Sequence, residues 1–135
     1  MTSRGYALGL GCERGCASEE VSALARKVLE QAGVAAKDLK GVYSIDQRAG
    51  EPALVLAAHG LGLRLECFGA QLLEEQTPRL LNPSERVFAL MGCHGVAEAA
   101  ALVGAGPDSI LLVGKTKSAH ATAALAAKNY AAGSS

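Results

Sequence analysis

Apolar residues along the chain switch between two spacings, and the switch predicts strands that alternate with helices. Tyr6–Leu10 is a short apolar run that ends in a glycine-rich turn. From Ser18 to Gly33, apolar residues recur at three- and four-residue steps, and Glu19 and Glu20 fall in the first turn. We expect Ser18 to be the N-cap and Gly33 the left-handed C-cap of a helix that packs one face on a sheet.

The next stretch repeats this order of strand, turn and helix. Gly41–Ile45 is rich in β-branched and aromatic residues and predicts a strand, which the polar loop Asp46–Gly50 follows. Pro52–His59 predicts a short helix closed by Gly60, and Leu63–Phe68 alternates well enough to be the next strand.

The second half of the chain has a less regular pattern. A segment with two prolines predicts a short helix, an irregular link and a new helix start at Ser84. Val96–Val103 is apolar on every side except at Glu98 and predicts a mostly buried helix, and Ser109–Val113 predicts a buried strand. Residues 118–127 fit either a helix, because alanine favours it, or an edge strand.

Strands that alternate with helices and are mostly apolar on both faces indicate an α/β domain with a largely parallel sheet covered on both sides. We expect residues 1–135 to form a single domain, with residues 1–5 and 128–135 as flexible ends.

Composition narrows the range of functions. Thirteen basic residues balance thirteen acidic ones, and the aromatic residues are few, so the chain lacks the character of a dedicated nucleic-acid binder. No window reaches the length of a membrane span, and the first residues do not resemble a secretory signal. We therefore expect a cytoplasmic protein without nucleic-acid or membrane partners, whose four cysteines are free thiols.

Two glycine-containing stretches suggest nucleotide binding, but neither has the required spacing. Gly9, Gly11 and Gly15 have one residue too many in the last gap of a dinucleotide fingerprint, and "GKT" lacks the upstream glycine of a phosphate loop. A tight strand-to-helix turn explains the glycines. One indication of ligand binding is left: Lys115 and Lys117 follow a strand, at the sheet edge where α/β proteins place ligands.

Thiol and metal chemistry are alternatives for the same region. Cys12, Cys16, Cys93 and His94 offer four zinc ligands, and Cys93 beside His94 before a helix offers a nucleophile. The cysteine spacing does not match common zinc knuckles, and adjacent side chains usually point apart. We therefore expect neither a metal nor another cofactor.

Four stretches follow one another in a recognisable order: "GLGCERG" with "SEEV", "SIDQRAGEPAL", "HGVAEAAAL" and "LLVGKTKSAHATAALA". Together they resemble the CobE family, which is also the C-terminal domain of the cobalamin-biosynthesis protein CbiG. The resemblance implies a three-layer α/β/α sandwich with a mostly parallel, mixed sheet, and it favours a strand over "HATAALA". Cys16 and the "CHG" before Val96 depart from the family pattern, which weakens the thiol and metal hypotheses.

The family resemblance implies a function in corrin-ring synthesis, and we expect the protein to bind a precorrin or later corrinoid. Such a ligand carries carboxylates around a flat apolar macrocycle, so its site needs separated cations and an apolar floor. The candidate binding residues lie in the turn after the first strand, in "CHG" and in the "GKTKS" loop: Gly11, Arg14, Gly15, His94, Lys115, Thr116 and Lys117. Other corrin-pathway enzymes are further candidate partners.

Two other functions stay open at this point. One is a pathway enzyme that hydrolyses or deacylates a precorrin-5-type intermediate, as CbiG does when it opens a lactone, with Glu98, Asp46 or Glu51 as acid or base. The other is a nucleotide-binding α/β domain. Glu98, a carboxylate on an apolar helix, must reach water or hold a partner such as Lys115, Lys117 or Arg14.

Overall fold

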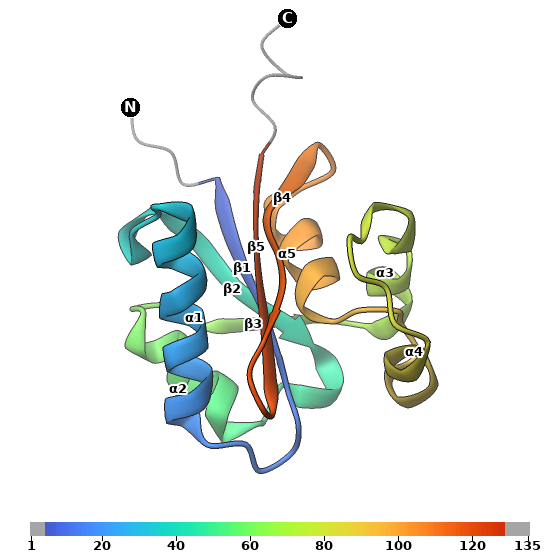
Figure 1. Cartoon of the computed structure of the whole chain (residues 1–135), viewed down its shortest axis with the longest axis horizontal. Coiled ribbons are helices and arrows are strands. Elements are labelled where there is room, and N and C mark those ends of the chain that lie inside the picture. The colour runs from blue at the N-terminus through green and yellow to red at the C-terminus, as the bar shows by residue number, and fades with distance from the viewer. Residues whose placement is uncertain (1–4, 129–135) are drawn as a thin grey trace, which may run out of the picture.

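The computed structural model describes residues 5–128, which form one five-stranded sheet with helices on both faces (Figure 1). The strand order is β3-β2-β1-β5-β4. The strands are β1 (Tyr6–Cys12), β2 (Leu39–Ile45), β3 (Leu65–Phe68), β4 (Ser109–Lys117) and β5 (Ala121–Lys128). The expected flexible ends lie outside the described residues apart from Gly5 and Lys128, and the Lys128 amide donates to the Gly5 carbonyl over 3.3 Å.

The sheet is mixed because one strand runs against the others. β1 pairs in parallel with β2, and β2 with β3, whereas β5 pairs antiparallel with both β1 and β4. Residues 118–127, which the sequence left open between helix and strand, therefore lie mainly in β5, as the family resemblance implied. β5 lies in the interior of the sheet rather than at its edge, so pairing on both sides overrides the helix preference of its alanines.

The helices form the two outer layers, which confirms the α/β/α architecture (Figure 1). α1 and α2 cover one face, and α5 covers the other, with α3 and α4 beyond it. The helices are α1 (Ser18–Ala32), α2 (Pro52–Gly60), α3 (Ala70–Glu74), α4 (Glu85–Met91) and α5 (Ala97–Ala105), and the 3₁₀ turns are η1 (Ala36–Asp38), η2 (Asp46–Arg48) and η3 (Thr77–Arg79).

Strand β1 contributes to both cores through its alternating side chains. Leu8 and Leu10 pack with α1 and α2, while Ala7 faces α5. Gly9 allows α5 to approach closely, because a Cβ at this position would lie 1.9 Å from the Ala97 carbonyl oxygen. The first glycine of the "GLGCERG" stretch therefore has a packing role.

The prediction for β4 was wrong in two respects. The strand is an edge strand, with Ile110 and Leu112 each 44% exposed, because the β5 strand that follows it lies between β4 and β1. A short apolar run does not distinguish a central strand from an edge strand. The strand also continues to Lys117, so Gly114–Lys117 belongs to β4 and is not a loop.

The helix ends agree with prediction at most positions. Gly33 is a left-handed C-cap with φ 69°, and the Ser84 hydroxyl caps α4 by accepting from the Val87 amide over 3.2 Å. The N-cap prediction for α1 was wrong: Ala17 occupies that position and Ser18 is the first helical residue. Within residues 5–128, no helix combines the length and the hydropathy that a membrane crossing needs.

Candidate functional site

A cleft of about 590 Å³ opens at the sheet edge where β1 and β2 end. Its walls come from those two strand ends, the β4–β5 hairpin, helix α4 and the segment before α5. In open α/β sheets ligands bind at the carboxyl ends of the parallel strands. The cleft therefore lies at the sheet edge where this kind of fold places ligands.

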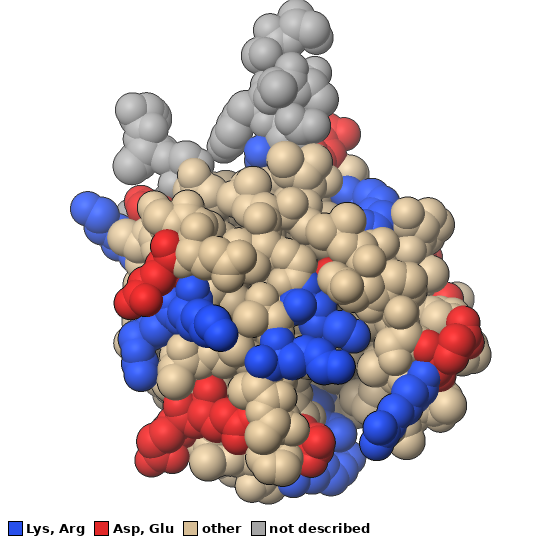
Figure 2. All heavy atoms as spheres, viewed as in Figure 1, with Lys and Arg blue, Asp and Glu red and all other residues tan. Residues whose placement is uncertain are grey.

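The cleft carries an excess of positive charge. Its lining includes Arg48, Arg86, Lys115 and Lys117, but only one carboxylate, Glu13. In the described part of the chain none of these four cations forms an ion pair, and every ion pair found there involves a histidine. In the view of Figure 2, Lys and Arg side chains gather near the middle of the molecule, over the β4–β5 hairpin. An anionic ligand can therefore meet cations that have no protein carboxylate to release.

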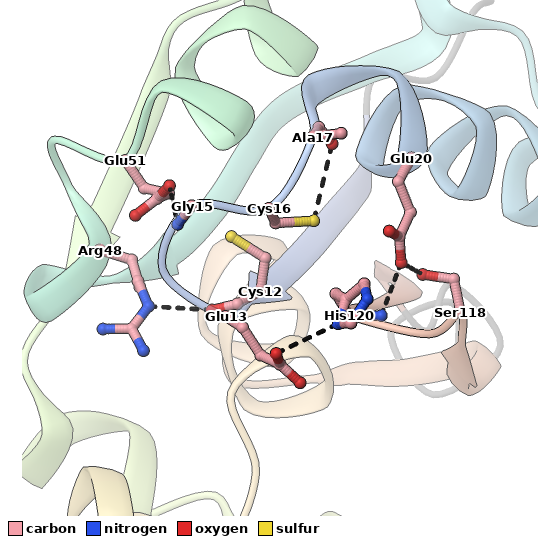
Figure 3. Close-up of polar contacts among 10 residues, drawn as sticks. All are labelled: Cys12, Glu13, Gly15, Cys16, Ala17, Glu20, Arg48, Glu51, Ser118 and His120. Atoms are coloured by element: carbon pink, nitrogen blue, oxygen red, sulfur yellow. Dashed lines mark hydrogen bonds and ion pairs between the residues drawn. The ribbon is translucent and has the colours of Figure 1, made fainter.

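Arg48 is the cation whose position is best defined. It lies in η2, directly after β2, and its Nε atom donates to the Cys12 carbonyl oxygen over 2.9 Å (Figure 3). Neither of its terminal nitrogens has a hydrogen bond to another residue in the range 5–128. The guanidinium is thus held by one nitrogen and can offer the other two to a carboxylate in a forked contact.

Helix α4 contributes Arg86 and also an apolar part of the cleft wall. Val87, Leu90 and Met91 line the cleft, and the Leu90 side chain is 69% exposed. An exposed leucine beside unpaired cations suits a ligand that combines an apolar body with anionic groups.

The turn between β1 and α1 is anchored to two other parts of the chain (Figure 3). The Gly15 amide, at φ 78°, donates to Glu51 over 3.0 Å. Glu20 of α1 accepts from the Ser118 hydroxyl and from the His120 amide at the tip of the β4–β5 hairpin. These bonds lower the pKa of Glu20, the Ser118 contact most strongly. The turn and the hairpin that border the cleft are therefore fixed relative to each other.

Three of the seven binding residues expected from the sequence line the cleft: Gly11, Lys115 and Lys117. Arg14 and Gly15 are exposed on the turn and are not part of the lining. Thr116 also lies outside it, and its hydroxyl donates to the Gly114 carbonyl over 3.0 Å.

His94, the seventh, lies between α3 and α4 and faces two carboxylates. Its Nδ1 is 2.8 Å from Glu74 Oε2, and its Nε2 is 3.3 Å from Glu85 Oε2. The hydrogen bond to Glu74 is the main cause that raises the pKa of His94 above its ordinary value of 6.5. The ring stacks on Phe88 with 4.4 Å between centroids. His94 therefore contacts the cleft wall from behind and does not line the cleft.

None of the three candidate catalytic carboxylates lines the cleft. Asp46 is exposed at the start of η2, and Glu51 is buried against the β1–α1 turn. Glu98 is 2% exposed, and its two oxygens accept hydrogen bonds of 2.7–3.0 Å from Lys115 N, Leu81 N, Asn82 N and Asn82 Nδ2. The expected partner Lys115 is present, but through its backbone amide, and Glu98 thereby joins α5 to β4.

The cysteines are in surroundings that disfavour the thiolate. Burial is the main cause that raises the pKa of Cys12 to about 12, and burial also raises the pKa of Cys93. Cys93 is fully buried, and its Sγ donates to the Gly95 carbonyl over 3.6 Å. Nothing in the described part of the chain groups three or more His, Cys, Asp or Glu side chains as a metal ion would require.

Sequence reasoning missed two of the four cleft cations. Arg48 lies in η2, the turn that follows β2, so the rule that ligands gather at carboxyl strand ends could have found it. Arg86 lies on α4, in the irregular middle of the chain, and only the tertiary packing of α4 brings it to the cleft.

The fold and the cleft define a class of protein: a mixed α/β domain that presents unpaired cations beside an apolar wall. The chain matches the family described as "Cobalamin synthesis G C-terminus" over residues 6–126, and it belongs to that family. Its role is in cobalamin biosynthesis, and the sequence-based resemblance to CobE and to the C-terminal domain of CbiG is confirmed.

Two relatives and one solved structure support the family assignment. Protein CobE of Sinorhizobium sp is 57% identical over 122 residues, which are 90% of this chain and 79% of that protein. Cobalt-precorrin-5A hydrolase of Priestia megaterium is 31% identical over 124 residues. The matched region is 92% of this chain but only 32% of the hydrolase. A crystal structure of CobE, a protein from the cobalamin biosynthetic pathway, matches with a TM-score of 0.82 and 35% identity, covering 90% of this chain and 89% of that one.

Proposed function

We propose that the protein binds a precorrin or corrinoid intermediate in the cleft at the ends of β1 and β2. The observation that carries the proposal is the set of four cations without carboxylate partners, Arg48, Arg86, Lys115 and Lys117, in a cleft with one apolar wall. The family places the protein in cobalamin biosynthesis. A precorrin or corrinoid is a flat apolar macrocycle with carboxylates around its edge, so it needs both cations and an apolar surface.

The cleft suits both the carboxylates and the apolar ring of such a ligand. Charge-assisted hydrogen bonds from arginine and lysine to carboxylates are stronger than neutral ones, and the arginine fork can bind two oxygens at once. The cations come from η2, α4 and β4, so they can contact carboxylates on different edges of one ring. Leu90 and Met91 can meanwhile cover the apolar face of the macrocycle.

Absorbance titration of the purified protein with a series of corrinoids that retain their carboxylates tests the proposal. We expect saturable binding of at least one corrinoid, with an affinity that falls as salt is raised, because the contacts are ionic. The same mixtures are analysed for products by mass spectrometry, and ATP, GTP and NAD are titrated in parallel.

The outcomes separate three functions. Binding without a new product supports a protein that holds an intermediate and exchanges it with other enzymes of the pathway. A hydrolysed or deacylated product would support a pathway enzyme, with Glu98, Asp46 and Glu51 as the first residues to substitute. Nucleotide binding without corrinoid binding would contradict both proposals.

A further inference from the structure

Helix α4 forms a wall of the cleft, yet it has little core of its own. It spans seven residues, Glu85–Met91, and none of them is buried. Four of them, Arg86, Val87, Leu90 and Met91, nevertheless line the cleft. A short exposed helix of this kind is not stable by itself, so contacts with other parts of the chain must hold it in place.

Most of the polar contacts that hold α4 converge on His94. The Ser84 amide at the start of α4 donates to the His94 carbonyl over 2.8 Å. The imidazole stacks on Phe88 and lies 3.3 Å from Glu85, and both of these residues belong to α4. One further bond, from Gln47 Nε2 to the Met91 carbonyl, ties the other end of the helix.

On its other side His94 is bound to α3. The Glu74 carboxylate accepts from the His94 amide over 2.9 Å and lies 2.8 Å from Nδ1. Both ring nitrogens therefore face carboxylates, and carboxylates only accept hydrogen bonds. The ring donates to Glu74 and Glu85 at once only as the doubly protonated imidazolium, whereas a neutral ring has a single N–H for the two acceptors.

We propose that His94 is a positioning residue that holds α4 against α3 and so sets the affinity of the cleft for its anionic ligand. The inference rests on the proposed function for its ligand, but the effect on α4 itself does not depend on any ligand. His94 acts from behind the wall, through Glu85 and Phe88, and does not touch the bound molecule.

The expected dependence on pH follows from the charge of the ring. The pKa of His94 is raised in the folded protein, so its stabilising effect is complete below the ordinary value of 6.5 and is lost as pH rises through the raised value. Glu74 and Glu85 are the charged groups that face the ring. The hydrogen bond to His94 is the main cause that lowers the pKa of Glu74.

The experiment compares wild-type protein with His94→Gln, and uses His59→Gln on the exposed end of α2 as the matched control. Amide hydrogen exchange, corrected for intrinsic rates, is measured without ligand at several values of pH. We expect His94→Gln to lose about tenfold or more of the protection in α4 while α5 is unchanged. In the wild type, α4 protection should fall as pH rises through the His94 midpoint measured by NMR.

Corrinoid titration over the same pH range gives the second readout. We expect His94→Gln to bind about fivefold more weakly at low pH and to lack the wild-type pH step, with Glu85→Gln showing a smaller change in the same direction. A second histidine, His120, lines the cleft and lies 3.2 Å from Glu13, so His120→Gln is included as a control and should keep the step.

Unchanged protection of α4 in His94→Gln would overturn the inference, and so would lost protection with unchanged corrinoid affinity and pH profile. If the wild type binds no corrinoid, the proposed function fails, and the exchange data alone still decide whether His94 holds α4.

Discussion

The Nε atom of Arg48 donates to the carbonyl oxygen of Cys12 over 2.9 Å, and this bond joins the segment after β2 to the end of β1. It fixes a guanidinium at the cleft without using the terminal nitrogens (Figure 3). A preorganised cation loses little side-chain freedom when a ligand binds, which favours affinity. The end of β1 thus supplies the carbonyl and the segment after β2 supplies the arginine, and both are needed to hold the guanidinium at the cleft.

Arg48→Lys should weaken corrinoid binding by about fivefold or more even though the charge is retained. Lysine lacks the planar fork and cannot donate from a fixed Nε while it binds a carboxylate with two other nitrogens. The measurement is absorbance titration at constant ionic strength, with Lys27→Arg on the exposed face of α1 as the matched control. Equal affinity for Arg48→Lys and wild type would mean that only the charge matters at this position.

Glu98→Ala should destabilise the fold by about 2–4 kcal/mol, because it leaves partly buried amides of the 81–82 segment and β4 without their acceptor. Glu98→Gln should cost less, since one acceptor oxygen is retained. Urea unfolding measures both variants, and Glu30→Ala on the exposed face of α1 is the control. A stable Glu98→Ala protein would show that the four hydrogen bonds contribute little.

Gly9→Ala should destabilise the fold by about 3 kcal/mol or more, because the added Cβ would overlap the Ala97 carbonyl oxygen and push α5 off the sheet. Gly50→Ala is the matched control, since a Cβ there would meet nothing within 4 Å. Thermal unfolding of the two variants gives the comparison. A Gly9→Ala melting temperature close to that of Gly50→Ala would contradict the close approach of β1 and α5.

The bond between Glu20 and the β4–β5 hairpin predicts an acid-sensitive contribution to stability. The pKa of Glu20 is lowered from 4.5 in the folded protein, so the contribution is present above that value and is lost as pH falls through the lowered value. Glu20→Gln should therefore lose stability at neutral pH and show a shallower decline between about pH 5 and pH 3. Chemical denaturation across this range is the measurement, and parallel declines in the two proteins would rule out the Glu20 contribution.

The layered fold was predictable because its signals are local. The helical spacing from Ser18 to Gly33 and the proline at the start of α2 mark their elements directly. The edge position of β4 was not predictable from its apolar run, since the return of β5 beside β1 depends on long-range pairing. The position of α4 was not predictable either, because only tertiary contacts place this helix, and Arg86 on it, at the cleft.

The candidate site was also predictable only where its signals are local. Lys115 and Lys117 were predicted as binding residues because they follow an obvious apolar strand segment, and both line the cleft. Arg14 also follows a strand closely, but it is exposed on a turn that the Gly15–Glu51 bond anchors, and it lies outside the lining. Whether a side chain at a strand end faces a cleft depends on such nonlocal bonds.

The proposed corrinoid site is tested most directly by one absorbance titration series that compares the corrinoid dissociation constants of wild type, Arg48→Ala, Lys117→Ala, Arg14→Ala and Lys27→Ala. We predict that Arg48→Ala and Lys117→Ala each bind about tenfold more weakly, that Arg14→Ala changes less than either, and that Lys27→Ala matches wild type. Lys117→Ala, Arg14→Ala and Lys27→Ala should keep nearly the wild-type melting temperature, as substitutions of exposed residues usually do. Arg48→Ala also loses the hydrogen bond to the Cys12 carbonyl and should melt at a slightly lower temperature. Wild-type affinity in both Arg48→Ala and Lys117→Ala, with binding intact, would contradict the claim that this cleft is the corrinoid site.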